Sequence, residues 1–220
     1  MRSLVVAPHP DDEVLGPGGT LLRRRAEGGD IGWAIMTEMT VDSGWSQEAI
    51  SRRRSEIEET RSFFAFSFVD ELKFPTSSLD QIPFLRMVER LTKTIKEFEP
   101  NEIFVPHHSD AHSDHRITFD IVSSCSKWFR QPNLRRVLSY ETVSETGFSL
   151  ISDNSFRPNW YVNIEKYLQD KLKALNIYQS EIGDAPFPRS EENLVALASF
   201  RGSSSGFKFA EAFQLMREFE

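Results

Sequence analysis

The chain alternates between short apolar runs and longer amphipathic stretches over its first two thirds. The apolar runs have the length of buried strands and cover residues 4–7, 31–36, 69–74, 102–105 and 136–143. The stretches between them place apolar residues at helical spacing and cover residues 20–27, 47–66, 84–98 and 117–129. Strands that alternate with helices of this length predict an α/β fold, with a mostly parallel sheet covered by helices on both faces.

The pattern is looser from about residue 144 onward. Residues 160–164 predict a strand and residues 165–181 a long helix, whereas residues 183–190 hold two prolines and residues 202–206 are rich in Gly and Ser. A chain of 220 residues can build one good-sized core but not two substantial domains. We therefore expect a single domain over residues 1–220, in which residues 1–143 form the core and residues 144–220 form a lid or cap and C-terminal elements on that core.

Composition and charge narrow the functional classes. With 26 Lys and Arg against 33 Asp and Glu, the net charge is −7, and the basic stripe of a general nucleic-acid-binding protein is missing. The single cysteine, Cys125, excludes an intrachain disulfide and lies in an apolar stretch that predicts a buried thiol. Without an apolar run long enough for a transmembrane segment and without a secretory signal, the sequence predicts a cytoplasmic protein. The 18 phenylalanines fit either a large core or the subunit interface of a homo-oligomer.

All five histidines lie in two polar segments that directly follow predicted strands. His9 belongs to the sequence PHPDDE at residues 8–13, and the other four lie in residues 107–115, after the strand at residues 102–105. The carboxyl ends of parallel strands meet at one edge of an open sheet, where ligands bind. We therefore expect these two segments to face each other although they are distant in the sequence.

The residue types in the two segments predict a metal site. Zinc binds imidazole nitrogen and carboxylate oxygen, and a catalytic zinc keeps three protein ligands and one open position. His9 and Asp12 can converge from one turn, and His115 can supply the third ligand from the other segment. These ligand types also suit Fe²⁺, Mn²⁺ and Co²⁺, so the residues by themselves do not select zinc.

Neighbouring polar residues suit the remainder of a hydrolytic site. Asp11 would lie beside the ion without being needed to bind it, which suits a general base. A protonated His112 could stabilise an oxyanion or protonate a leaving amine, and Asp114 could hold an imidazole in one tautomer. An isolated Asp-Asp pair is more often a turn or a helix cap. Four histidines within nine residues, matched by a second His/Asp segment, argue against that structural explanation here.

The two segments resemble the signatures of the PIG-L/LmbE-like zinc-dependent de-N-acetylase family. Residues 8–13 are similar to the family's HPDDE motif, and residues 112–116, HSDHR, are similar to its HxDHR motif. Similarity at residues 53–56 (RRSE), 171–181 and 210–213 (AEAF) extends the resemblance over nearly the whole chain. The resemblance implies a Rossmann-like fold with zinc on His9, Asp12 and His115. It also implies Asp11 as the base that activates water and His112 as the residue that stabilises the tetrahedral intermediate.

The same resemblance implies a substrate-binding role for Arg53, although a salt bridge to Glu56 on the same helix explains this arginine equally well. Two segments depart from the family pattern. Residues 74–78, FPTSS, lack the Asp of a YPD-like segment that helps to line the sugar pocket in relatives. Phe187 occupies a position where some relatives have His, so any hydrogen bond of that His is lost or replaced here.

The sequence therefore predicts zinc-dependent removal of an N-acetyl group from a small-molecule substrate of the N-acetylglucosamine type, either free, nucleotide-linked or lipid-linked. One alternative is an amidase for a larger acyl group on a sugar conjugate. Another is a metal- or sugar-nucleotide-binding regulatory protein without turnover, which would not need Asp11. A dinucleotide-binding oxidoreductase fits the alternating pattern, but residues 16–19, GPGG, do not form GxGxxG and follow an acidic segment that would repel pyrophosphate.

Overall fold

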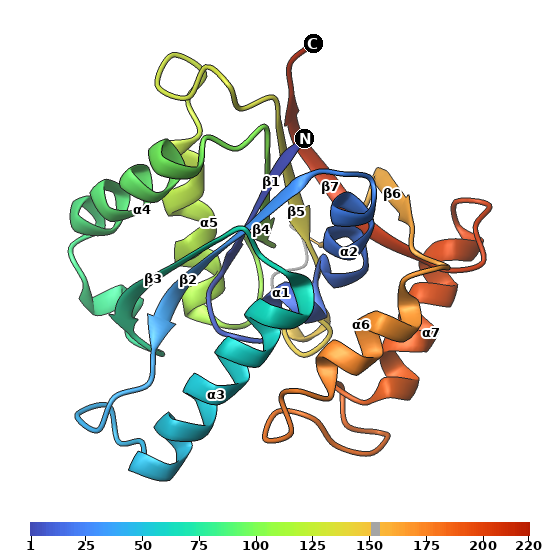
Figure 1. The fold of residues 1–220 in the computed structure, drawn as a ribbon, viewed down its shortest axis with the longest axis horizontal. Helices are drawn as coiled ribbons and strands as arrows, with labels where there is room; N and C mark the ends of the chain where they lie inside the picture. Colours follow the sequence, from blue (N-terminus) through green and yellow to red (C-terminus); the bar gives the residue numbers. More distant parts are fainter. Residues whose placement is uncertain (151–154) are drawn as a thin grey trace.

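The structure is a computed structural model that describes residues 1–150 and 155–220. Within these residues, a seven-stranded sheet runs through the centre of the molecule in the order β3-β2-β1-β4-β5-β7-β6 (Figure 1). Its strands are β1 (Arg2–Ala7), β2 (Asp30–Glu38), β3 (Phe68–Pro75), β4 (Glu102–Pro106), β5 (Arg136–Tyr140), β6 (Trp160–Asn163) and β7 (Ala210–Glu218). The first five strands pair in parallel, and β7 runs antiparallel to both of its neighbours. The predicted mostly parallel sheet is confirmed.

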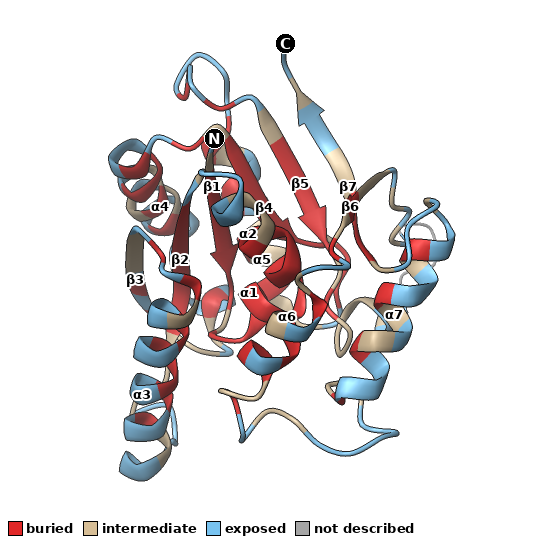
Figure 2. Ribbon diagram, turned by 45° about the vertical axis from the view of Figure 1, so that its right-hand side comes forward, coloured by how far each residue is buried: buried red, intermediate tan, exposed pale blue. Residues whose placement is uncertain are grey.

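Helices cover both faces of this sheet, also as predicted (Figure 2). They are α1 (Asp12–Leu15), α2 (Gly18–Ala26), α3 (Gln47–Phe64), α4 (Phe84–Phe98), α5 (Ser113–Cys125), α6 (Leu168–Leu175) and α7 (Glu191–Ser203), with the short 3₁₀ helices η1 (Leu79–Gln81) and η2 (Thr146–Phe148). Because side chains alternate along a strand, β1 divides its residues between two cores. Leu4 and Val6 pack with α4 and α5, whereas Val5 and Ala7 pack with helices on the opposite face.

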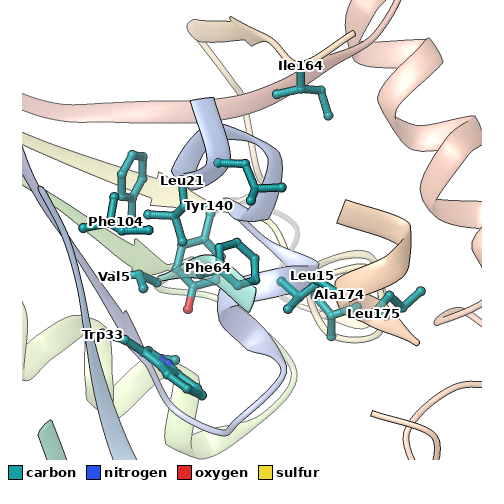
Figure 3. Packing of buried hydrophobic residues seen from close by; sticks show 14 of the residues in the cluster. Val5, Leu15, Leu21, Trp33, Phe64, Phe104, Tyr140, Ile164, Ala174 and Leu175 are labelled. Carbon is teal, nitrogen blue, oxygen red and sulfur yellow. The ribbon is translucent and has the colours of Figure 1, made fainter. Parts of the chain in front are cut away.

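Large aromatic side chains fill the second of these cores (Figure 3). Trp33, Phe64 and Phe104 are completely buried there, and Tyr140 is almost so. Cys125 is buried in the other core, as the sequence predicts. Among the described residues, no helix is both long enough and apolar enough to span a membrane.

The glycines at residues 16–19 allow close packing of the turn between α1 and α2. A Cβ atom on Gly16 would lie 2.8 Å from the Cγ atom of Tyr140, and one on Gly19 would lie 2.9 Å from the side chain of Ile164. Both separations are shorter than real Cβ contacts. Residues 16–19 therefore pack against buried side chains. They do not form the phosphate-binding loop that a dinucleotide-binding oxidoreductase would need at this position.

Helix α5 begins earlier than the sequence predicts. The expected range was residues 117–129, but the helix is Ser113–Cys125 because the His112 side chain accepts a hydrogen bond from the backbone N–H of Asp114 and caps its first turn. His115 consequently lies within the first turn of a helix, which fixes its backbone, and not in an open loop.

The C-terminal third differs most from expectation. The predicted helix at residues 165–181 is wrong in length, because α6 covers only Leu168–Leu175. The turn that follows α6 buries Tyr178, whose hydroxyl donates to Glu13 Oε1 at 2.7 Å. Strand β7, which the sequence analysis did not recognise, inserts between β5 and β6. The C-terminal third therefore completes the sheet in addition to placing residues 183–190 near the candidate site.

Candidate active site

The two His/Asp segments meet at the carboxyl edge of the sheet. His9 follows β1, the segment at residues 107–112 follows β4, and these two strands are parallel neighbours. His9, Asp12 and His115 each offer one ligand atom, and these three atoms lie within 4.8 Å of one another. The structure thus brings the three predicted metal ligands together.

Backbone geometry at residues 9–13 separates the functions of adjacent side chains. The backbone N–H of His9 donates to Asp12 Oδ2 at 2.9 Å, which closes the turn. Asp11 has a φ of 127°, a conformation that few residues other than glycine adopt. The Asp11 N–H donates to Glu13 Oε2 at 3.0 Å, so the buried Glu13 carboxyl stabilises the turn through this hydrogen bond.

Each candidate imidazole ligand contacts a second carboxylate. His9 Nε2 lies 3.0 Å from Asp114 Oδ2, and His115 Nδ1 lies 2.9 Å from Asp110 Oδ2. The other ring nitrogen of each histidine faces Asp12 Oδ2, at 3.5 Å for His9 Nδ1 and 3.3 Å for His115 Nε2. Carboxylates that hold the distal nitrogen of metal-binding histidines are a regular feature of metal sites. The donor set of these residues therefore fits a divalent cation.

The electrostatics of the cluster favour positive charge at its centre. Burial alone would lower the pKa of His9, but its hydrogen bonds to Asp114 and Asp12 raise that pKa to about 9. Burial likewise opposes protonation of His115, whereas Asp12 and Asp110 raise its pKa to about 10. Asp12 is buried, yet the two imidazoles hold the pKa of its carboxyl well below the usual range. A divalent cation would benefit from the same carboxylates that here stabilise protonated imidazoles.

A second triad, His9, His112 and Asp114, also offers three ligand atoms that lie within 4.8 Å of one another. Asp114, however, accepts hydrogen bonds from the backbone N–H groups of Ser77 at 2.7 Å and Leu79 at 3.2 Å. His112 Nδ1 is engaged with the Asp114 N–H at 3.1 Å. These contacts suit residues that orient ligands, so we favour the set of His9, Asp12 and His115.

Asp11 does not belong to that triad but lines, together with His9 and His112, the pocket beside it, called the candidate pocket. Its Oδ2 accepts a hydrogen bond from Arg189 Nη1 at 2.7 Å. Burial raises the pKa of the Asp11 carboxyl to about 7, and the opposing effect of Arg189 limits the rise. A carboxyl with such a pKa is suited to take up and release a proton near neutral pH.

His112 presents a neutral ring to the site. Burial, together with the charges of His9 and His115, lowers the pKa of His112 to about 4. Because its Nδ1 accepts from the Asp114 N–H, the neutral ring carries its proton on Nε2. His112 can therefore donate a hydrogen bond as a neutral group and does not need the protonated form that is expected from the sequence.

Arg53 lines the pocket and is also the partner of Glu56. Its guanidinium donates to the Pro10 carbonyl at 2.5 Å and pairs with Glu181, while its Nε lies 3.1 Å from Glu56 Oε2. The salt bridge to Glu56 is thus confirmed, and the substrate-binding role stays a prediction for a residue that lines the pocket. The contact of Arg53 with Pro10 connects α3 to the turn that carries Asp11.

Several polar residues at the site are not predicted from the sequence. Asp110 and Glu13 lie in the two His/Asp segments, but the sequence pattern assigns neither of them a role. Arg189 and Glu181 meet Asp11 and Arg53 from the C-terminal third. Phe187, for which the sequence predicts that the hydrogen bond of a His in relatives is lost or replaced, is 46% exposed and does not line the pocket. The polar contact from this segment comes instead from Arg189, two residues later.

The sequence of the chain is similar to a known family and to a deacetylase. The family model described as "PIG-L: GlcNAc-PI de-N-acetylase" matches residues 4–126. A diacetylchitobiose deacetylase of Thermococcus kodakarensis is 26% identical over 229 residues, which cover 98% of this chain and 83% of that protein.

Solved structures share the fold over the full length of the chain. The N,N'-diacetylchitobiose deacetylase from Pyrococcus horikoshii aligns with a TM-score of 0.79 at 24% identity, covering 98% of this chain and 84% of that one. The 4-carboxy-2-hydroxymuconate hydratase GalB from Pseudomonas putida aligns with a TM-score of 0.76 at 15% identity, covering 100% and 98%. Since a deacetylase and a hydratase share it, the fold alone does not define a reaction.

Proposed function

Because the chain belongs to the PIG-L (GlcNAc-PI de-N-acetylase) family, we propose that it is a metal-dependent hydrolase that removes the N-acetyl group from an N-acetylglucosamine-type sugar or sugar conjugate. The observation that carries the proposal is the convergence of His9, Asp12 and His115 beside a pocket that His9 lines together with Asp11, a carboxyl that the triad does not include. The diacetylchitobiose deacetylase relative supports an amino-sugar substrate.

The cofactor that we propose is Zn²⁺, with Fe²⁺, Mn²⁺ or Co²⁺ as alternatives that the same ligand types accept. His9, Asp12 and His115 would hold it, while Asp114 and Asp110 orient the two imidazoles. When bound, such a cation supplies a Lewis acid for the amide carbonyl and lowers the pKa of water.

The chain's own residues handle the protons of the reaction. Asp11 takes a proton from the water whose oxygen forms a bond to the amide carbon. Nε2–H of His112 donates a hydrogen bond to the carbonyl oxygen as negative charge develops there. The protonated Asp11 then returns its proton to the nitrogen as the C–N bond breaks, which yields acetic acid and the amine. At neutral pH the acid proton passes to the amine, so the products are acetate and the protonated amine.

Arg189 and Glu13 set the position of Asp11 during these transfers. Arg189 Nη1 also lies 3.0 Å from Glu181 Oε2, so its guanidinium is held by two carboxylates. Glu13 anchors the Asp11 backbone in its left-handed conformation. The carboxyl is thereby fixed before the substrate arrives, which is the form of preorganisation that proton transfer requires.

The direct test is mass spectrometry of N-acetyl sugars after incubation with protein loaded separately with each of the four metals. The set should include N-acetylglucosamine, N,N'-diacetylchitobiose and a nucleotide-linked N-acetyl sugar, with N-propionyl and N-butyryl analogues for the larger-acyl alternative. We expect at least one N-acetyl member to lose an acetyl group. Failure of every member with every metal would contradict the proposal, and hydrolysis confined to the larger acyl groups would favour the amidase.

A further inference from the structure

The loop at residues 39–46, which joins β2 to α3 (Figure 1), brings a tryptophan into the wall of the candidate pocket. Trp45 lines this pocket together with Asp11 and Arg53. Its side chain is 39% exposed, and within the described part of the chain no aromatic ring stacks on it. The indole of Trp45 takes no part in the proposed proton transfers, although it lines the same pocket as Asp11, the proposed base.

The backbone around Trp45 is well fixed despite its exposure. The Gly44 N–H donates to the Val41 carbonyl at 2.9 Å and the Trp45 N–H to the Thr40 carbonyl at 3.3 Å, which closes a turn. Gly44 takes the positive φ that this turn needs, at 89°. On the other side, the next residue caps α3 by accepting from the Ala49 N–H at 3.2 Å. A ring on such a loop loses little conformational freedom when a ligand covers it.

The pocket around Trp45 combines apolar and polar walls. Ile50 and Ile57 of α3 are buried side chains that line it, and Met39 adds a further apolar group. Glu38, at the end of β2, lines the same pocket, and in the part of the chain described here its carboxylate makes no ion pair. A pyranose ring has the matching chemistry, since one face carries C–H groups and its rim carries hydroxyl groups.

We propose that Trp45 is the stacking platform of a saccharide subsite, with a pyranose ring of the substrate over the indole and its hydroxyl groups donating hydrogen bonds to Glu38. The inference rests on the proposed function, because it assumes that the ligand of this pocket is a sugar whose acetamide group reaches Asp11. The stacked ring is either the N-acetylated sugar itself or the next sugar of a conjugate, and the two cases share the same chemistry.

Binding to a variant that cannot turn over tests the subsite separately from the reaction. Asp11→Asn protein is titrated with N-acetylglucosamine and with N,N'-diacetylchitobiose by calorimetry and by tryptophan fluorescence; Asn also tolerates the positive φ of residue 11. In this background we expect Trp45→Ala to weaken binding by about tenfold and Trp45→Phe by about threefold. The ligand-induced change in fluorescence should disappear in Trp45→Phe.

Trp128→Ala is the matched control, because Trp128 is 64% exposed and lies outside the pocket. It should leave both dissociation constants unchanged. An effect of Trp45→Ala on both sugars places the N-acetylated ring over the indole, and an effect on the disaccharide alone places the second ring there; either supports the proposal. Dissociation constants that stay unchanged in Trp45→Ala would overturn the proposal. A change in the oligomeric state of this variant, measured by light scattering, that accounts for its weaker sugar binding would overturn it as well.

Hydrolysis of the full set of N-acetyl sugars by the wild-type protein, loaded with each metal, separates the two proposals. Binding that depends on Trp45 without hydrolysis of any member would leave the subsite intact and refute the proposed reaction. Hydrolysis combined with binding that does not depend on Trp45 would support the proposed reaction and refute the subsite. Absence of both would overturn both proposals.

Discussion

Asp11 and Asp12 are adjacent and chemically identical, yet their surroundings prepare them for opposite tasks. Asp12 faces two imidazoles, which keep the pKa of its carboxyl well below the usual range although burial opposes this. Asp11 faces Arg189, and burial raises the pKa of its carboxyl to about 7. The permanently charged carboxylate suits a cation ligand, whereas the carboxyl that can change its protonation state suits a base.

Removing the base should abolish turnover and leave the cation site intact. Asp11→Asn keeps the size of the side chain but cannot accept a proton, so we expect the deacetylation rate to fall by about 10²- to 10⁴-fold. Metal content, measured by mass spectrometry of the digested protein, should match that of the wild type. The exposed Asp120→Asn on α5 serves as the control and should retain full activity. A normal rate in the Asp11 variant would refute its role.

The charge of Arg189 should set the acidic limb of the pH–rate profile. Asp11 acts in its deprotonated form, so kcat/KM rises with pH through its pKa, and Arg189 opposes the rise in this pKa that burial causes. In Arg189→Met the pKa of Asp11 should increase, and the acidic limb should move to higher pH. Arg54 lines the same pocket, but in the described part of the chain it forms no ion pair with Asp11, whereas Arg189 does. Arg54→Met is therefore the control and should leave the acidic limb at the wild-type pH. An unmoved limb in Arg189→Met would show that another group controls it.

Asp110 should matter for metal affinity although it is not one of the predicted ligands. Its Oδ2 lies 2.9 Å from His115 Nδ1, and loss of such a partner typically weakens metal binding by about 10- to 100-fold. We expect this loss in Asp110→Ala, measured by competition with a chelator. Asp110→Asn retains a hydrogen-bond acceptor and should lose less. If the wild type and both Asp110 variants bind the metal with equal affinity, the contact of Asp110 with His115 does not contribute to metal binding.

At the scale of elements, a buried charge cluster connects the C-terminal third to the first helices. Lys171 of α6 donates to Glu211 of β7 at 2.6 Å and to the carbonyls of Leu15 and Gly16 at 3.1 and 3.0 Å. Glu211 also accepts from the N–H groups of Gly19 and Thr20 at 2.8 and 2.7 Å, at the start of α2. The glutamate of the AEAF sequence is thus explained as a helix cap that joins three elements.

This cluster predicts a large asymmetry between two lysines of the same helix. Lys171→Met leaves Glu211 buried without its cation, which should lower the free energy of unfolding by about 3–5 kcal/mol. Lys173→Met removes a lysine whose side chain is 67% exposed and should change stability by less than about 1 kcal/mol. Urea denaturation measures both values. Similar losses in the two variants would show that the Lys171 cluster adds little to stability.

The elements that the sequence predicts well are those whose burial is visible in the residues themselves, as an unbroken apolar run for a strand or as one apolar face for a helix. The strands of the parallel sheet and helix α4 follow directly from apolar runs and helical spacing. Helix α5 is displaced because its start depends on the cap at His112, and α6 ends early where Tyr178 turns into the core. Strand β7 was missed because its first four residues are all buried although one of them is a glutamate, and the residues after them are only partly buried or exposed, so neither an apolar run nor an alternation marks the strand. In each case tertiary contacts override the local pattern.

At the scale of the whole molecule, the site forms because parallel β1 and β4 end side by side between two cores. This geometry explains why the predicted ligands could be paired from the sequence, since strand ends in such sheets share one edge. The partners Asp110 and Arg189 could not be assigned in the same way. Which carboxylate contacts which imidazole, and which arginine of the C-terminal third reaches Asp11, depends on packing that local patterns do not encode.

The proposed function requires one divalent cation between the segments that follow β1 and β4. Anomalous diffraction from crystals of the metal-loaded protein locates such an ion. We expect a peak beside the candidate pocket with His9, Asp12 and His115 as ligands, at distances of about 2.0–2.2 Å if the metal is zinc. A metal bound by other residues, or no anomalous peak at this position at saturating metal, would contradict the proposed function.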